Sequence, residues 1–142
     1  MKIGSISENK KLEKRIAVTP DVAKKYIKLG FELSLSENYG VHLGISDKEF
    51  KDIGVNIVKD EKELIKNSEL IVQLGLLSED KIFLIKEGQT IVGILNPYNN
   101  KEKIEGLAKK KINLFSLELL PRITRAQSMD ILSSQANLAG YK

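Results

Sequence analysis

The stretch Glu69-Leu70-Ile71-Val72-Gln73-Leu74 indicates the fold, because it is an almost continuous apolar run. A strand with one face in water alternates apolar and polar residues. A strand covered on both faces is apolar nearly throughout, as in the parallel sheets of α/β proteins. We therefore expect residues 69–74 to form an inner strand of a parallel sheet.

Strands and helices are predicted to alternate on both sides of this run. Further strands are expected at 2–7, 31–36, 55–58, 90–95 and 112–116, and helices at 20–29, 46–53, 60–67, 78–86, 100–110 and from about 124 to the end. This alternation predicts an α/β fold with a doubly wound, mostly parallel sheet and helices on both faces, Rossmann-like or flavodoxin-like. Ligands of such sheets bind beyond the carboxyl ends of the strands. A site is therefore expected in the loops that follow Ser7, Leu74, Leu95 and Ser116.

Capping residues mark several of these helix boundaries. Thr19 is expected to cap the helix that begins at Pro20, and Gly30 is expected to end it. Ser46 and Glu49 have the spacing of a capping box, which predicts the start of the next helix.

Composition restricts the classes of function. The 142 residues correspond to one domain, 1–142. The chain lacks cysteine and has one histidine, His42, which excludes disulfides, thiolate metal sites and histidine-rich metal sites. The net charge of +4 comes from scattered basic residues without a stripe of interleaved aromatics, so we expect no nucleic-acid partner. The apolar runs are too short to cross a bilayer and no signal peptide is visible, so we expect a cytoplasmic protein.

Two loops carry residues with some chemical potential. Arg15 lies between the first strand and the helix at Pro20, where its guanidinium could bind a carboxylate or phosphate. Position alone favours the simpler alternative, an exposed surface arginine. Asn96 could hydrogen-bond a ligand, although Asn96-Pro97 more simply makes a turn. His42 is expected to be a surface or loop residue.

The stretch 121–141 is the most informative. If it is one helix, Gln127, Asp130, Ser134 and Asn137 share a polar face. Met129, Leu132, Ala136 and Ala139 then form the opposite, apolar face. An ordinary amphipathic surface helix is the default interpretation of such a pattern. The glycine fingerprint G-x-G-x-x-G is absent from the sequence, so a dinucleotide phosphate site is not predicted here.

Two segments resemble a known family. The stretch Glu13-Lys14-Arg15-Ile16-Ala17-Val18-Thr19-Pro20 resembles the motif that opens alanine dehydrogenases, saccharopine dehydrogenases and the alpha subunits of proton-translocating NAD(P) transhydrogenases. The stretch from Pro121-Arg122-Ile123-Thr124-Arg125-Ala126-Gln127-Ser128-Met129-Asp130 through Leu132-Ser133-Ser134-Gln135 to Gly140-Tyr141 resembles the transhydrogenase form in particular. The resemblance covers essentially the whole chain, and its second motif is the more specific.

The resemblance implies a site for NAD(H). In that family a loop of this region reaches over the nicotinamide, and its residues match Arg122, Gln127, Asp130 and Ser133. The implied roles are binding of the carboxamide for Arg122, Asp130 and Ser133, and contact with NADP(H) on a partner domain for Gln127. Hydride then passes between the two cofactors, whose chemistry it is. No residue of this chain is expected to be catalytic, and no metal is expected.

The chain departs from alanine dehydrogenases at two positions. Those enzymes carry a catalytic lysine after the fourth strand and a histidine after the fifth, where this chain has Gly75 and Asn96. An alanine dehydrogenase-like oxidoreductase fragment is therefore the weaker interpretation. Arg15 is present in both groups and does not distinguish them.

The resemblance also implies partners. Family members continue into a Rossmann domain that this sequence lacks, so we expect the domain to be incomplete and inactive alone, ending within its last helix. Expected partners are a Rossmann-bearing remainder of the alpha subunit and an NADP-binding and membrane subunit at the inner face of the membrane, and a homodimer is expected. Two alternatives stay open: a folded non-catalytic remnant or interaction domain, and a small-ligand binding module built on Arg15.

Overall fold

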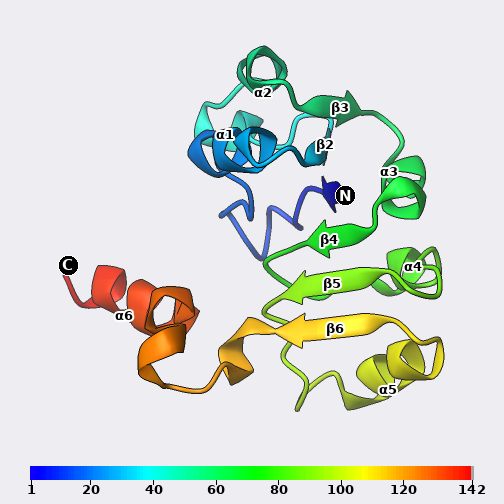
Figure 1. Cartoon of the computed structure of the whole chain (residues 1–142), viewed down its shortest axis with the longest axis vertical. Helices are drawn as coiled ribbons and strands as arrows, with labels where there is room; N and C mark the ends of the chain where they lie inside the picture. Colours follow the sequence, from blue (N-terminus) through cyan, green and yellow to red (C-terminus); the bar gives the residue numbers. More distant parts are fainter. Residues whose placement is uncertain (142) are drawn as a thin grey trace.

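Six parallel strands form the sheet of the computed structural model, which describes residues 1–141 (Figure 1). Their order is β3-β2-β1-β4-β5-β6, and every neighbouring pair is parallel. The strands are β1 (Lys2–Ser5), β2 (Glu32–Ser36), β3 (Asn56–Val58), β4 (Leu70–Val72), β5 (Thr90–Gly93) and β6 (Asn113–Ser116). This is the Rossmann strand order, and it reverses direction between β1 and β4. The predicted fold class is confirmed.

The helices connect successive strands. They are α1 (Pro20–Lys28), α2 (Asp47–Ile53), α3 (Glu61–Asn67), α4 (Glu79–Ile82), α5 (Lys101–Lys109) and α6 (Ile131–Gly140). Short 3-10 helices occur at η1 (Val41–Leu43), η2 (Leu117–Leu119) and η3 (Thr124–Met129). The predicted caps are confirmed: Thr19 accepts a hydrogen bond from the Val22 N–H, and Ser46 with Glu49 forms a capping box. Helix α4 is shorter than predicted.

Two separate clusters of apolar side chains cover the two faces of the sheet. One cluster includes Ile3, Ala23 and Phe50 and packs with α1 and α2. The other includes Ile65, Ile82 and Leu107 and packs with α3, α4 and α5. Strand β4 contributes to both, since Ile71 lies in the second cluster while Leu70 and Val72 pack against the first. This two-sided burial is why residues 69–74 are apolar almost throughout.

The last segment of the chain differs from the prediction of one continuous helix. Residues 124–129 form the 3-10 helix η3, and α6 begins only at Ile131. Between them Asp130 has an extended backbone (φ −73°, ψ 93°) and accepts the Ser133 N–H as the N-cap of α6. Aspartate favours such caps over helix interiors. Gln127 and Asp130 therefore do not share a helical face with Ser134 and Asn137, and the predicted stripe is wrong.

Helix α6 ends at Gly140, and Lys142, where the last helix was expected to continue, lies outside the described residues. The apolar residues predicted for its free face are exposed, with 45% of Leu132 and 67% of Leu138 accessible. In Figure 1 this red segment projects away from the sheet beside the end of β6. Across residues 1–141, no helix is both long and apolar enough to cross a membrane.

Gly93 at the end of β5 tests how closely β4 and β5 approach. A Cβ at this position would overlap the backbone carbonyl oxygen of Gln73, which the sheet holds in place. We expect Gly93→Ala to lower the free energy of unfolding by about 2 kcal/mol, since backbone cannot move aside as a flexible side chain does. Urea unfolding measures the change.

Gly106 provides the matched control. It lies within α5, and a Cβ there would meet no atom within 4 Å. Gly106→Ala should raise stability by roughly 0.5–1 kcal/mol, because alanine restricts the unfolded chain and favours the helix. Equal stability of the two variants would contradict the close approach of β4 and β5.

Candidate functional site

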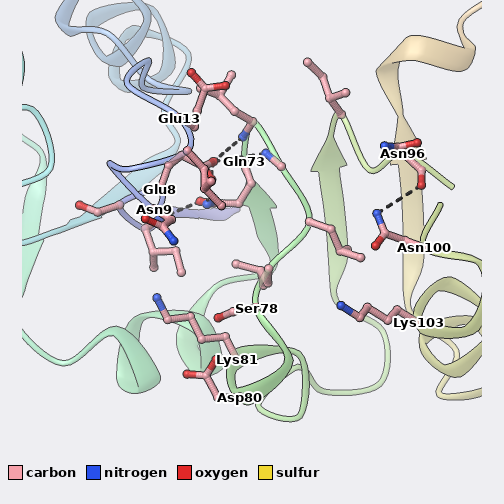
Figure 2. A pocket seen from close by; sticks show the side chains of 18 of the residues that line it. Glu8, Asn9, Glu13, Gln73, Ser78, Asp80, Lys81, Asn96, Asn100 and Lys103 are labelled. Atoms are coloured by element: carbon pink, nitrogen blue, oxygen red, sulfur yellow. Dashed lines mark hydrogen bonds between the residues drawn. The ribbon is translucent and has the colours of Figure 1, made fainter.

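The largest cavity, of about 840 Å³, lies beyond the carboxyl ends of β1, β4 and β5, where the strand order reverses (Figure 2). This is the place that the doubly wound sheet predicts for a site. Its polar lining comes mainly from the loops after these strands and includes Glu8, Asn9, Glu13, Arg15, Gln73, Lys81, Asn96, Asn100 and Lys103.

A chain of buried hydrogen bonds forms the floor of this cavity. The Gln73 side-chain oxygen accepts from the Ile6 N–H at 2.8 Å and from the Ser5 hydroxyl at 3.1 Å. The Ser5 and Tyr39 hydroxyl oxygens lie 2.7 Å apart. Tyr39 also accepts the Val18 N–H at 3.1 Å. Because the Ser5 proton is used toward Gln73, the Tyr39 hydroxyl donates to Ser5. Burial raises the pKa of Tyr39, which keeps this donor protonated.

Glu8 occupies the backbone N–H groups at the end of β4. Its Oε1 accepts from the Leu74 N–H at 2.7 Å, the Gly75 N–H at 3.3 Å and the Gln73 side-chain amide at 3.1 Å. Burial raises the pKa of Glu8, while the Leu74 and Gly75 N–H groups partly offset this and the Glu13 charge adds to it. Successive backbone N–H groups of this kind form anion sites in other folds. Here the chain fills the site with its own carboxylate.

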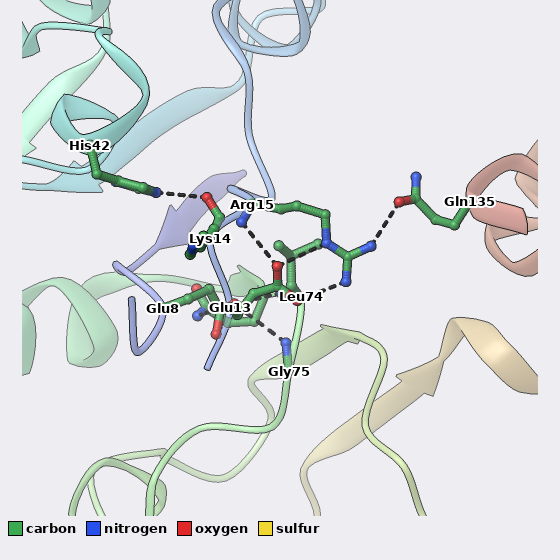
Figure 3. A network of polar contacts seen from close by, with 9 residues as sticks. Glu8, Glu13, Lys14, Arg15, His42, Leu74, Gly75 and Gln135 are labelled. Atoms are coloured by element: carbon green, nitrogen blue, oxygen red, sulfur yellow. Dashed lines mark hydrogen bonds and ion pairs between the residues drawn. The ribbon is translucent and has the colours of Figure 1, made fainter. Parts of the chain in front are cut away.

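Arg15 has its donors engaged within the chain (Figure 3). Its Nε donates to Glu13 Oε1 at 2.8 Å and its Nη2 to Glu13 Oε2 at 2.7 Å, a bidentate pair. Its Nη1 donates to the Gln135 side-chain oxygen at 2.7 Å. The hydrogen bonds from Arg15 lower the pKa of Glu13 to about 2. A ligand carboxylate would have to compete with Glu13 for Arg15, so the predicted ligand-binding role of Arg15 stays a prediction.

Gly75 and Asn96 both line the large cavity, so the two positions that hold lysine and histidine in alanine dehydrogenases do meet here. Asn96 has a positive φ of 47°, and its N–H donates to Glu118 at 2.6 Å. Neither residue supplies a proton-transfer group. His42 is exposed in η1, and its Nε2 lies 2.8 Å from the Lys14 carbonyl oxygen, as a loop residue.

A second, smaller cavity of about 310 Å³ brings together three of the residues predicted to contact the nicotinamide. It is lined by Arg122, Gln127 and Asp130 with their neighbours on η3. Ser133 joins them through Asp130, since its hydroxyl donates to Asp130 Oδ2 at 2.6 Å and its N–H to Oδ1 at 3.0 Å. The Ser133 hydrogen bonds lower the pKa of Asp130, with a smaller contribution from the Arg122 charge. A guanidinium and a carboxylate thus face one small cavity.

Comparison with known proteins gives the affiliation of this arrangement. The model of the family "Alanine dehydrogenase/PNT, N-terminal domain" matches residues 4–139. The chain belongs to this family. Over 146 residues it is 40% identical to the first of the polypeptides that make up the NAD(P) transhydrogenase alpha subunit of Rickettsia prowazekii, covering all of this chain and 38% of that protein. The family affiliation predicted from the sequence is confirmed.

Solved structures agree with this. A transhydrogenase from Sinorhizobium meliloti superposes with a TM-score of 0.91 at 35% identity, covering 99% of this chain and 42% of that one. An L-alanine dehydrogenase superposes with a TM-score of 0.77 at 20% identity over 83% of this chain and 32% of that one, which shows a shared fold. The chain thus spans about two fifths of the length of the transhydrogenases it matches.

Four residues of the two cavities were missed in the sequence: Glu8, Glu13, Gln73 and Gln135. Gln73 carried a detectable signal, because it is the one polar side chain inside an apolar strand stretch. Glu8 follows a predicted strand at the edge where a site was expected. Neither signal identifies the partner. The link between Arg15 and Gln135 spans 120 positions and has no local signature.

The raised pKa of Glu8 gives a pH-dependent prediction. A carboxyl whose pKa is raised by folding binds protons more tightly in the folded state, so its protonated form favours folding. We expect wild type to gain stability relative to Glu8→Gln as the pH falls from neutral through the raised folded pKa toward the ordinary value of 4.5. Urea unfolding of both proteins across this range measures the difference.

Glu49→Gln is the control for this measurement. Glu49 lies in the capping box of α2, where hydrogen bonds from Ser46 lower its pKa. The difference between wild type and Glu49→Gln should therefore have the opposite sign, with wild type losing relative stability as the pH falls below 4.5. A Glu8 difference that is independent of pH would contradict the burial of this carboxyl.

Proposed function

We propose that this chain is part of the NAD(H)-binding component of a proton-translocating NAD(P) transhydrogenase and contacts the nicotinamide ring. The observation that supports this most directly is the gathering of Arg122, Gln127 and Asp130 around one cavity. It occurs in a chain whose whole length matches a polypeptide of a transhydrogenase alpha subunit. NADP(H) is then held by a partner domain.

The side chains around this cavity are complementary to a carboxamide. The Arg122 guanidinium can donate to a carbonyl oxygen, and a carboxylate such as Asp130 can accept from an amide NH₂. The Ser133 hydroxyl and N–H hold the Asp130 carboxylate in orientation. Gln127, on η3, lines the same cavity and is the candidate for contact with the second cofactor. Bound nicotinamides supply the hydride chemistry, and these residues bind and orient them.

The adenosine and pyrophosphate need a second polypeptide segment in this proposal. Glu8 fills the backbone N–H groups at the end of β4, and the sequence has no glycine fingerprint. The chain corresponds to 38% of the Rickettsia prowazekii relative. We therefore infer that a Rossmann-bearing polypeptide completes the NAD site, and that a homodimer and an NADP-binding membrane subunit complete the enzyme. The exposed Leu132 and Leu138 of α6 offer apolar surface for such contacts.

A non-catalytic interaction domain is the second candidate. Both Asp130 oxygens are engaged by Ser133, which is also what a helix cap alone requires. An alanine dehydrogenase activity is less well supported, because Gly75 and Asn96 stand where those enzymes hold lysine and histidine.

Affinity capture from native cells tests the composition of the enzyme. We expect a tag on this chain to recover a Rossmann-bearing polypeptide, either as a partner or as part of a longer product, identified by intact mass. We further expect the recovered assembly to bind NADH while the isolated 142-residue chain binds it weakly or not at all. Isothermal titration measures both. Micromolar NADH affinity of the isolated chain, or the absence of any Rossmann-bearing polypeptide, would overturn this proposal.

Variants of Asp130 and Arg122 separate the two candidate functions. Asparagine caps a helix about as well as aspartate, so Asp130→Asn should retain α6 and remove only the carboxylate. We expect this variant and Arg122→Met to weaken NADH binding by the assembly roughly tenfold, the effect of one charged hydrogen bond. Lys109→Gln, at the exposed end of α5, is the control. Unchanged NADH affinity in both variants would favour the interaction domain.

A further inference from the structure

The C-terminal segment 121–141 has few attachments to the rest of the domain. No residue of α6 is buried, and the helix packs beside η2. Within residues 1–141, one hydrogen bond joins this segment to the rest of the chain, and it runs from Arg15 Nη1 to the Gln135 side-chain oxygen. The orientation of α6 therefore depends strongly on this contact.

Arg15 is itself held in a fixed direction. The guanidinium is planar, and the bidentate contact with Glu13 fixes that plane. The Arg15 N–H adds a third contact to the Glu13 carboxylate at 2.9 Å. The remaining donor, Nη1, then points to α6, as Figure 3 shows for Arg15 between Glu13 and Gln135. Glu13 is 27% exposed, so the pair is partly shielded from solvent.

We propose that Arg15 is a positioning residue for the nicotinamide-binding segment, acting through Gln135. Gln135 lies two positions after Ser133 on α6, and Asp130 caps the same helix. A hydrogen bond that fixes the second turn of a short helix also fixes its first turn. Arg15 thus determines where Asp130 and Ser133 stand relative to the domain without itself contacting a ligand. This inference rests on the proposed function.

The same geometry gives Glu13 a defined part. Without Glu13, the Arg15 side chain would be free to rotate and would lose entropy on contacting Gln135. With Glu13 in place, that cost is met within the loop before α1. Glu13 and Arg15 therefore work as a unit in which the first residue orients the second, and the second orients α6.

Hydrogen exchange of the α6 amides tests the positioning directly. Gln135→Met keeps the length of the side chain and removes the acceptor, whereas Asn137→Leu removes an exposed amide from the same helix that has no contact with Arg15. We expect exchange across residues 131–140 to rise roughly fivefold in Gln135→Met, as the loss of one hydrogen bond implies, and to stay unchanged in Asn137→Leu. Gln135→Glu retains an oxygen acceptor and should restore protection.

A double-mutant cycle shows that the two residues act together. Arg15→Met combined with Gln135→Met should raise exchange no further than either single change, because both remove the same contact. Additive effects of the two changes would overturn the proposal. Unchanged exchange in Gln135→Met would overturn it as well.

The NADH affinity of the assembly then connects positioning to function. We expect Gln135→Met to weaken NADH binding by about fivefold and Gln135→Glu to restore it. If Asp130→Asn weakens binding while Gln135→Met does not, the positioning role is wrong and the proposed function stands. If Asp130→Asn and Arg122→Met both leave NADH binding unchanged, the proposed function fails, and the positioning role fails with it.

Discussion

The hydrogen bonds of the Gln73 side chain hold the two halves of the sheet together at the point where the strand order reverses. Helices on either side of this point cover opposite faces, so the strand ends of β1 and β4 border an open crevice instead of a covering helix. Polar backbone is buried here and must be paired. Gln73 pairs it by accepting from Ile6 and Ser5 and donating to Glu8. The cavity, the path of the first loop and the position of Arg15 all depend on this arrangement.

Most of the fold could be predicted from local sequence, because each element carries its own signal. The apolar stretch around Ile71 reflects burial on both faces, and Thr19 and Ser46 show where helices begin. The end of the chain was predicted incorrectly for a local reason. A helical period alone treats Asp130 as one more polar position, whereas its carboxylate pairs with the Ser133 N–H and interrupts the helix.

The candidate site was less accessible to sequence reasoning. Arg122, Gln127, Asp130 and Ser133 came from a family resemblance, and their period gave only an amphipathic stripe. The residues that support them, Glu13, Arg15 and Gln135, come together only after the chain has folded. Whether a charged side chain is free or already paired is a property of such distant contacts. Arg15 shows this, since its position suggested a ligand contact and the structure pairs its donors with Glu13 and Gln135.

The carboxylate of Glu8 at the end of β4 has a consequence for selectivity. Phosphorylated metabolites are abundant in cells, and an unfilled set of backbone N–H groups would attract many of them. Glu8 fills these groups, and Glu13 adds a second negative charge to the same crevice. Free phosphate and nucleotides are thereby repelled before they reach the sheet. The domain keeps the backbone of a nucleotide-binding fold while discouraging the unwanted occupants that such a backbone would otherwise collect.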